Sequence, residues 1–164
     1  MTWTRAATAV VVLCGALLAG CASDPSRLPL GVDRAQALQQ LGTPTSIYPL
    51  PDGERLQYSY GPAGFAVFNV DIDAAGRVRS VRQELNEGLF ASTIRPGEWR
   101  VEDVLRTYGR PYEQSRVSSF DGVVWSWRYL NINNLRFLYI YIDPTGRVDH
   151  YNLGDDLSDR RLWW

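Results

Sequence analysis

The cysteine at position 21 is placed where a chemical modification can be expected. Cys21 directly follows the small residues Ala19-Gly20, which close an apolar N-terminal run. Arg5 supplies positive charge before that run, residues 6–18 form its apolar part, and the small residues suit a cleavage site. The run is too short to be a membrane-spanning helix. These features predict that residues 1–20 are an export signal.

The segment Leu18-Ala19-Gly20-Cys21 resembles the lipobox of bacterial lipoprotein signal peptidase substrates. The resemblance implies that Cys21 becomes the mature N-terminus and carries a diacylglyceryl thioether and an N-acyl chain. Several acyl chains anchor a protein stably, because each buried methylene contributes about 0.8 kcal/mol. Ala22 stands where an aspartate would signal retention in the inner membrane, so we expect a lipid-anchored, periplasm-facing protein of the outer membrane. The alternative is an ordinary secretory signal with an incidental Cys21.

The composition argues against several functional classes. The chain has 18 acidic and 17 basic residues and a formal net charge of −1, and no basic block stands out, so nucleic acid is not an expected partner. Cys14 would leave with the signal and Cys21 would be blocked by lipid, so no disulfide is expected. No nucleophile-elbow motif or other catalytic constellation is visible. We therefore predict no enzymatic activity and no small-molecule cofactor.

Two further features could carry chemistry, and each has a simpler interpretation. His150 is the only histidine and lies between Asp149 and Tyr151 in an expected strand, with no cysteine or second histidine to complete a metal site. We interpret it as a sheet residue. Asp71 and Asp73 could bind a cation, but a solvated strand face that ends in a turn aspartate explains them better. No metal site is predicted.

Three kinds of local signal recur in the same order along the chain, which indicates an internal duplication. The matching pairs are Leu41–Pro44 with Tyr108–Pro111, Asp52-Gly53 with Asp121-Gly122, and Asp73–Val78 with Asp143–Val148. We predict a tether over 21–29, a first unit over 30–86, a second unit over 87–154 and a tail over 155–164.

Each unit is expected to begin with a helix. Asp33 suits the N-cap of the first helix, and Gly42 and Gly109 suit the ends of the two helices. A short third helix is expected over 84–93. The apolar positions predicted to face the core are Leu38, Leu41, Leu89, Phe90, Val101, Val104, Leu105 and Tyr108.

Alternating strands follow each main helix and predict an antiparallel meander. The resulting class is α+β, with two tandem units and the helices packed on one sheet face. One strand of each unit is apolar at the same alternate positions, so these side chains are expected to pack in the core. Leu56, Tyr58 and Tyr60 of the first unit match Trp125, Trp127 and Tyr129 of the second.

The next strand differs between the units. Phe137, Tyr139 and Tyr141 are aromatic, and exposed aromatic area marks contact surfaces. We predict a protein-binding face there, with Arg128 and Arg136 at its rim, although the tail or the first unit could instead cover it. The residues at the matching positions of the first unit are mostly polar and are expected to face solvent: Val67, Asn69 and Asp71.

The tail ends in two tryptophans after Arg160-Arg161. Trp163 and Trp164 could dock on a partner or lie at a lipid interface, where tryptophan is favoured. They could also fold back over the aromatic face. We favour the fold-back, because two free terminal tryptophans would promote association.

The succession of motifs resembles the SmpA/OmlA (BamE-like) family. It consists of a lipobox, a helix ending in Leu-Gly-x-Pro, a Trp/Tyr-rich strand and an alternating strand closed by Asp-x-x-Gly-Arg-Val. Members are outer-membrane lipoproteins accessory to β-barrel assembly, so the resemblance implies a scaffold that binds another envelope protein. The duplicated unit is also similar to the β-lactamase inhibitor protein. An inhibitor-like or glycan-binding module that uses the aromatic face is the alternative.

Overall fold

A computed structural model describes residues 24–61 and 64–156 of the chain. The first half contains the short 3-10 helix η1 (Pro25–Arg27), helix α1 (Arg34–Leu41) and strands β1 (Ser46–Leu50), β2 (Gly53–Ser59), β3 (Val67–Asp73) and β4 (Val78–Gln83). The second half contains helices α2 (Glu87–Thr93) and α3 (Val101–Tyr108) and strands β5 (Glu113–Ser115), β6 (Val123–Asn131), β7 (Asn134–Ile142) and β8 (Val148–Asp155).

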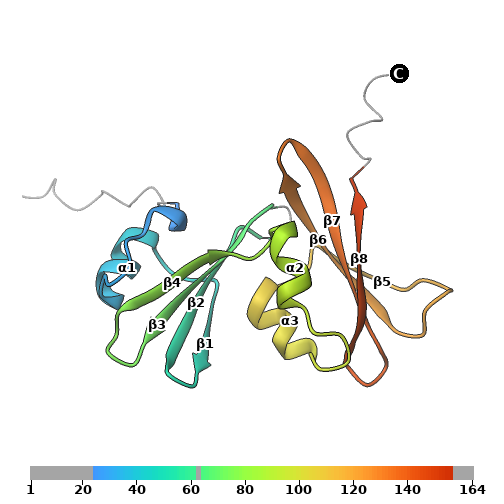
Figure 1. Cartoon of the computed structure of the whole chain (residues 1–164), viewed down its shortest axis with the longest axis horizontal. Helices are drawn as coiled ribbons and strands as arrows, with labels where there is room; N and C mark the ends of the chain where they lie inside the picture. The colour runs from blue at the N-terminus through green and yellow to red at the C-terminus, as the bar shows by residue number, and fades with distance from the viewer. Residues whose placement is uncertain (1–23, 62–63, 157–164) are drawn as a thin grey trace, which may run out of the picture.

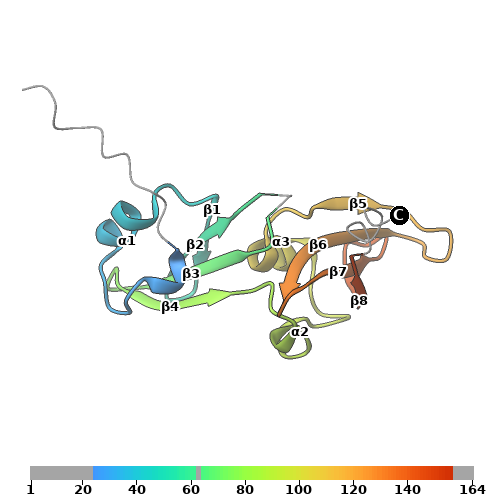
Figure 2. The same cartoon turned by 90° about the horizontal axis from the view of Figure 1, so that it is seen from above.

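The strands form two antiparallel sheets of four strands each. The first sheet has the order β1-β2-β3-β4 and the second sheet has the order β5-β6-β7-β8. Helix α1 packs on one face of the first sheet, while α2 and α3 lie between the two sheets (Figures 1 and 2). The predicted mixed α and β class with antiparallel meanders is confirmed.

The helix ends follow the local signals in the sequence. The Asp33 carboxylate accepts a hydrogen bond from the Gln36 amide at 2.9 Å, which satisfies one of the free N–H groups at the start of α1. Gly42 and Gly109 end α1 and α3 with φ angles of 78° and 67°, where a side chain would be strained. Helix α2 begins at Glu87, three residues later than the start expected at residue 84, because Asn86 caps it.

The two Asp-x-x-Gly-Arg turns have the same construction. The Asp73 carboxylate accepts from the amides of Ala75 and Arg77, both at 2.9 Å. The Asp143 carboxylate accepts from the amides of Thr145 at 2.8 Å and Arg147 at 3.0 Å. Each turn therefore fixes the register of a β-hairpin, β3–β4 or β7–β8.

Each sheet has its own apolar core on the side of its helix. The first core is formed by Leu28, Ala37, Leu41, Leu56, Tyr58, Val70, Ile72 and Val78. The second core is larger and richer in aromatic side chains, and its members include Phe90, Val104, Tyr108, Trp125, Trp127, Tyr129, Leu138 and Ile140. The expected packing roles of Trp125, Trp127 and Tyr129 are confirmed, whereas Tyr60 lies beyond the end of β2 and is 51% exposed.

The start of the folded part differs from the sequence prediction. Residues 24–29 were expected to belong to a tether, but residues 25–27 form η1 and Leu28 joins the first core with 6% exposure. Burial of the apolar Leu28 side chain in that core explains why the chain is held there. Among the described residues, no helix is long and apolar enough to cross a membrane.

Replacing Leu56 by alanine tests the first core. Leu56 has 0% exposure, so Leu56→Ala is expected to lower the free energy of unfolding by about 2–5 kcal/mol. Leu30, which is 66% exposed, provides a matched control. Leu30→Ala is expected to change the free energy of unfolding by less than about 0.5 kcal/mol. Urea unfolding of the purified proteins measures both values. Equal effects of the two substitutions would contradict this assignment of the core.

Candidate functional site

The C-terminal end of α3 is held by side chains of the first sheet. We call the sheet face that turns away from α1 the far face of the first sheet. From this face the Gln57 amide donates to the carbonyls of Leu105 at 3.2 Å and Arg106 at 3.1 Å, and the Asn69 amide donates to the carbonyl of Thr107 at 3.0 Å. The Leu105 carbonyl also accepts from the Gly109 amide at 2.9 Å, but the last carbonyls of a helix, here those of Arg106 and Thr107, lack backbone partners within it, so the Gln57 and Asn69 amides act as a cap. We call this contact the seam.

Two longer side chains complete the seam. The Tyr48 hydroxyl donates to the Leu105 carbonyl at 3.3 Å, and Arg55 donates to the Arg106 carbonyl at 3.4 Å. Arg55 also holds Asp71 in a two-point ion pair, with nitrogen-to-oxygen distances of 2.7 and 2.9 Å. A guanidinium matches a carboxylate in this planar geometry, so the pair fixes Arg55 against the helix end.

The seam overturns the prediction that this face meets solvent. Val67, Asn69 and Asp71 are 2%, 1% and 9% exposed, so all three are buried. The proposed solvated position of Asp71 is also wrong, because its carboxylate is bound by Arg55. Within residues 24–61 and 64–156, no group of three or more His, Cys, Asp or Glu side chains could hold a metal ion.

Glu84 is a seam residue that the sequence analysis missed. It was expected to start a helix, but it is 1% exposed and one of its oxygens accepts from Asn69 at 3.1 Å and from Arg82 at 2.9 Å. These contacts orient the Asn69 amide toward α3. A buried charge needs such partners, and nothing in the local sequence distinguishes Glu84 from an exposed glutamate.

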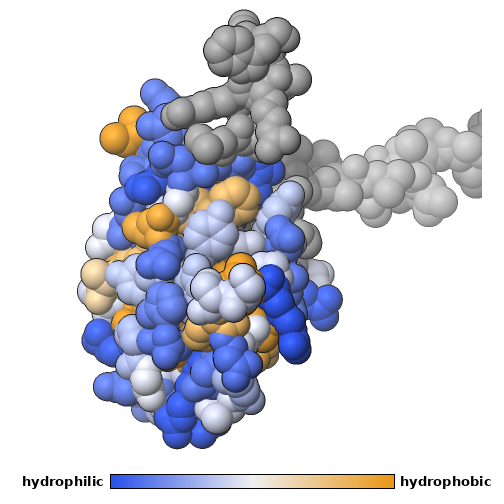
Figure 3. All heavy atoms as spheres, turned by 90° about the vertical axis from the view of Figure 1, so that its right-hand side faces the viewer, coloured by the Kyte–Doolittle hydropathy of each residue, from blue (hydrophilic) through white to orange (hydrophobic). Residues whose placement is uncertain are grey.

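Aromatic side chains lie on the far face of the second sheet, the face that turns away from α3. Phe137, Tyr139 and Tyr141 point to this face from β7, and each is half-buried. We call these three residues the aromatic row. Figure 3 views the molecule from this side and shows apolar patches among hydrophilic side chains. No described part of the first half of the chain buries the row completely.

The rings of the aromatic row contact one another and their neighbours. Phe137 and Tyr139 stack with their centroids 5.5 Å apart, and Tyr141 stacks on His150 at 4.0 Å. Phe120 meets Tyr141 edge-on at 5.2 Å. His150 also contacts Asp149 through its Nδ1 at 2.6 Å, so it lies on the sheet as part of this aromatic surface.

Arg128 lies on the same face, as predicted, and Arg136 does not. The Arg128 guanidinium lies 5.4 Å from the ring centres of Phe65 and Tyr112 and pairs with Asp156. Arg136 points to the helix side of the sheet, where it contacts Glu87 at 2.6 Å. The placement of Arg136 at the rim is therefore wrong. Its strand position shares the side of Leu138 and Ile140, and strand alternation sends all three inward.

Three predicted site residues lie outside the described residues. These are the lipidation site Cys21 and the tail tryptophans Trp163 and Trp164.

No family model matches the chain, and no curated protein matches it. Among solved structures, the chain is similar to a DUF4309 family protein, YjgB, from Bacillus subtilis. The similarity covers 76% of this chain and 78% of that chain, with 14% sequence identity and a TM-score of 0.30. A likeness at this TM-score carries no argument about fold or function.

A cluster around Glu87 joins α2 to the second sheet. One oxygen of Glu87 accepts from the Tyr129 hydroxyl at 2.7 Å, from the Asn131 amide at 2.8 Å and from Arg136 at 2.6 Å. The hydrogen bond from Tyr129 is the largest cause that lowers the pKa of Glu87, and Arg136 and Asn131 add to it. Burial, followed by the hydrogen bond to Glu87 and then the charge of Glu87, raises the pKa of the Tyr129 hydroxyl, which stays protonated as the donor.

The Glu87 cluster predicts a pH dependence of stability. A carboxyl group whose pKa is lowered by folding stabilises the fold above its ordinary pKa of 4.5, and this contribution is lost as the pH falls through the folded value. The free energy of unfolding should therefore fall below about pH 4.5, and Glu87→Gln should reduce that fall. Urea unfolding over a pH series measures it. Glu98→Gln, at an exposed position, is the control, and an unchanged slope for Glu87→Gln would contradict the assignment.

Proposed function

We propose that this chain is a lipid-anchored envelope protein without enzymatic activity, which binds another protein through the far face of its second sheet. The lipobox-like segment at Cys21 supports the anchor and the envelope location. The aromatic row supports protein binding. The position of Ala22 favours the outer membrane, and a role beside β-barrel assembly follows from the resemblance of the motifs to the SmpA/OmlA family.

We further infer that the chain is a tandem of two related units. Equivalent hydrogen bonds in the two halves support this inference. The Gly31 amide donates to the Val78 carbonyl at 2.8 Å, and the Gly97 amide donates to the Val148 carbonyl at 2.7 Å. Arg77 and Arg147 each donate to the carbonyl of the corresponding glycine at 3.1 Å. Two such matches, in equivalent elements, are difficult to obtain from unrelated sequences.

One observation is the main support for the protein-binding role. In a tandem chain, the aromatic row occupies the positions that Val67, Asn69 and Asp71 occupy in the first sheet, and those residues are buried against α3. The far face of the first sheet is thus a contact surface within the chain. On the equivalent face of the second sheet the aromatic row is only half-buried among the described residues, and Arg128 lies beside it. Aromatic residues and arginine are enriched where protein interfaces gain most of their affinity.

The ring geometry favours a protein partner over a glycan. A sugar that stacks on an aromatic platform needs open ring faces. Here Phe137 and Tyr139 stack on each other, and Tyr141 stacks on His150. The rings instead pack against one another in two groups, which suits the packed side chains of a protein interface.

Crosslinking from the aromatic row tests the binding role. A photoreactive amino acid at position 139 is expected to capture an envelope protein in cells, while the same group at position 60 should not. Tyr60 is the matched control because it is an exposed tyrosine of the first half. Tyr139→Ala should weaken retention of the captured protein at least about tenfold, and Tyr60→Ala should leave it unchanged. Retention of every partner by Tyr139→Ala would argue against this face.

Metabolic labelling tests the anchor separately. Labelled palmitate should enter the wild-type protein, and Cys21→Ala should abolish the label and release the protein from the membrane fraction. Cys14→Ala is the matched control, and it should be labelled like the wild type because that cysteine lies within the expected signal. Absence of label from the wild type would refute the lipoprotein assignment without affecting the binding role.

A further inference from the structure

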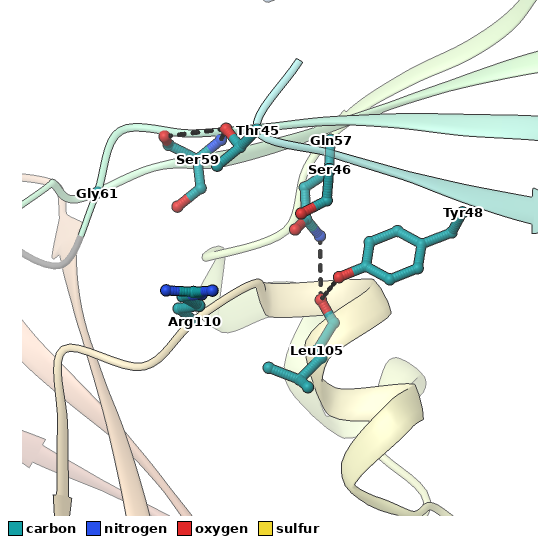
Figure 4. Close-up of a pocket in the computed structure, with 8 residues that line it drawn as sticks. All are labelled: Thr45, Ser46, Tyr48, Gln57, Ser59, Gly61, Leu105 and Arg110. Atoms are coloured by element: carbon teal, nitrogen blue, oxygen red, sulfur yellow. Dashed lines mark hydrogen bonds between the residues drawn. The ribbon is translucent and has the colours of Figure 1, made fainter.

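A pocket of about 400 Å³ opens beside the seam, between the first sheet and the end of α3 (Figure 4). Strands β1 and β2 form one wall, and Leu105 and Arg110 form the other. Pockets that bind small molecules have volumes from about 300 Å³ upward, so the space suffices for a small ligand.

Internal hydrogen bonds hold the walls in place. The Thr45 hydroxyl accepts from the Ser59 amide at 2.8 Å and donates to the Ser59 carbonyl at 3.3 Å, which joins the start of β1 to the end of β2. Tyr48 and Gln57 both donate to the Leu105 carbonyl, as Figure 4 shows. A ligand would therefore meet a pocket whose shape is already formed, so less conformational entropy is lost on binding.

Three donor groups of the pocket have no partner among the described residues. These are the hydroxyls of Ser46 and Ser59 and the guanidinium of Arg110. In Figure 4 the Ser59 hydroxyl points to the side of the pocket where the Arg110 guanidinium lies. No aspartate or glutamate lines the pocket, so the Arg110 charge is not neutralised within it.

We propose that this pocket binds a small organic carboxylate. The Arg110 guanidinium would hold the carboxylate through two parallel N–H donors, and the Ser59 and Ser46 hydroxyls would add hydrogen bonds. The Leu105 side chain and the Tyr48 ring offer an apolar surface for the body of the ligand. The ligand would touch both the first sheet and the segment after α3, and binding would therefore strengthen the seam. This site does not depend on the protein-binding role proposed above.

An NMR titration of the ¹⁵N-labelled, purified full-length protein tests the site. N-acetyl-L-leucine serves as the probe, and its amide, N-acetyl-L-leucinamide, is the matched control without the carboxylate. The acid should cause saturable shifts at the amides of Ser59, Gly61 and Arg110, whereas the amide should cause none. Inorganic phosphate has no apolar body and should bind at least about tenfold more weakly than the acid.

Variants separate the pocket from nonspecific charge effects. Arg110→Gln should weaken binding of the acid at least about tenfold, since it removes a charge-assisted contact, while Arg110→Lys should retain part of it. Arg116→Gln, at an exposed arginine that does not line the pocket, should bind like the wild type. Absence of saturable shifts in the wild type would overturn the proposal. Binding of the acid to Arg110→Gln as tightly as to the wild type would also overturn it. So would binding of the amide probe or of phosphate to the wild type as tightly as the acid.

Discussion

The arrangement of the molecule depends on how the last carbonyls of α3 are satisfied. The carbonyls of Arg106 and Thr107 lack backbone partners within the helix, and the seam buries them against the first sheet. A buried carbonyl without a hydrogen bond costs about 1–3 kcal/mol, so a sheet could not cover this helix end unless it supplied donors. Gln57 and Asn69 supply them. Because α3 packs its apolar side against the second sheet, the same short helix joins both halves of the chain.

The seam is polar, and this makes the contact directional. Its donors are aimed at particular carbonyls, and they are themselves held by Glu84, Arg82 and the pair of Arg55 with Asp71. An apolar surface would tolerate a shifted or rotated helix, whereas a network of directed hydrogen bonds is disrupted by such a shift. Burial, followed by the charge of Glu84, raises the pKa of the nearby Tyr108 hydroxyl, so the second core receives no additional charge from it.

Local signals in the sequence were sufficient to predict most of the helices and strands. Asp33, Gly42, Gly109 and the two turn aspartates act through neighbours only a few residues away, and their roles were predictable for that reason. The far face of the first sheet was predicted wrongly because alternation only distinguishes an apolar side from a polar one. Gln57 alternates with apolar residues just as a solvated glutamine would, yet its partners lie 48 and 49 residues away. Whether water or a helix end satisfies a polar side chain depends on tertiary structure, which alternation does not contain.

The two far faces differ in the kind of contact that they can make. The first sheet presents amide and guanidinium donors, which suit the carbonyl end of a helix. In the tandem arrangement that we propose, the positions of Arg55, Gln57 and Asn69 are matched in the second sheet by Val124, Ser126 and Tyr139, so an apolar side chain and hydroxyl groups replace the guanidinium and amide donors. The half-buried rings of the aromatic row therefore favour a partner that brings apolar side chains, such as the side of a helix or the face of another sheet.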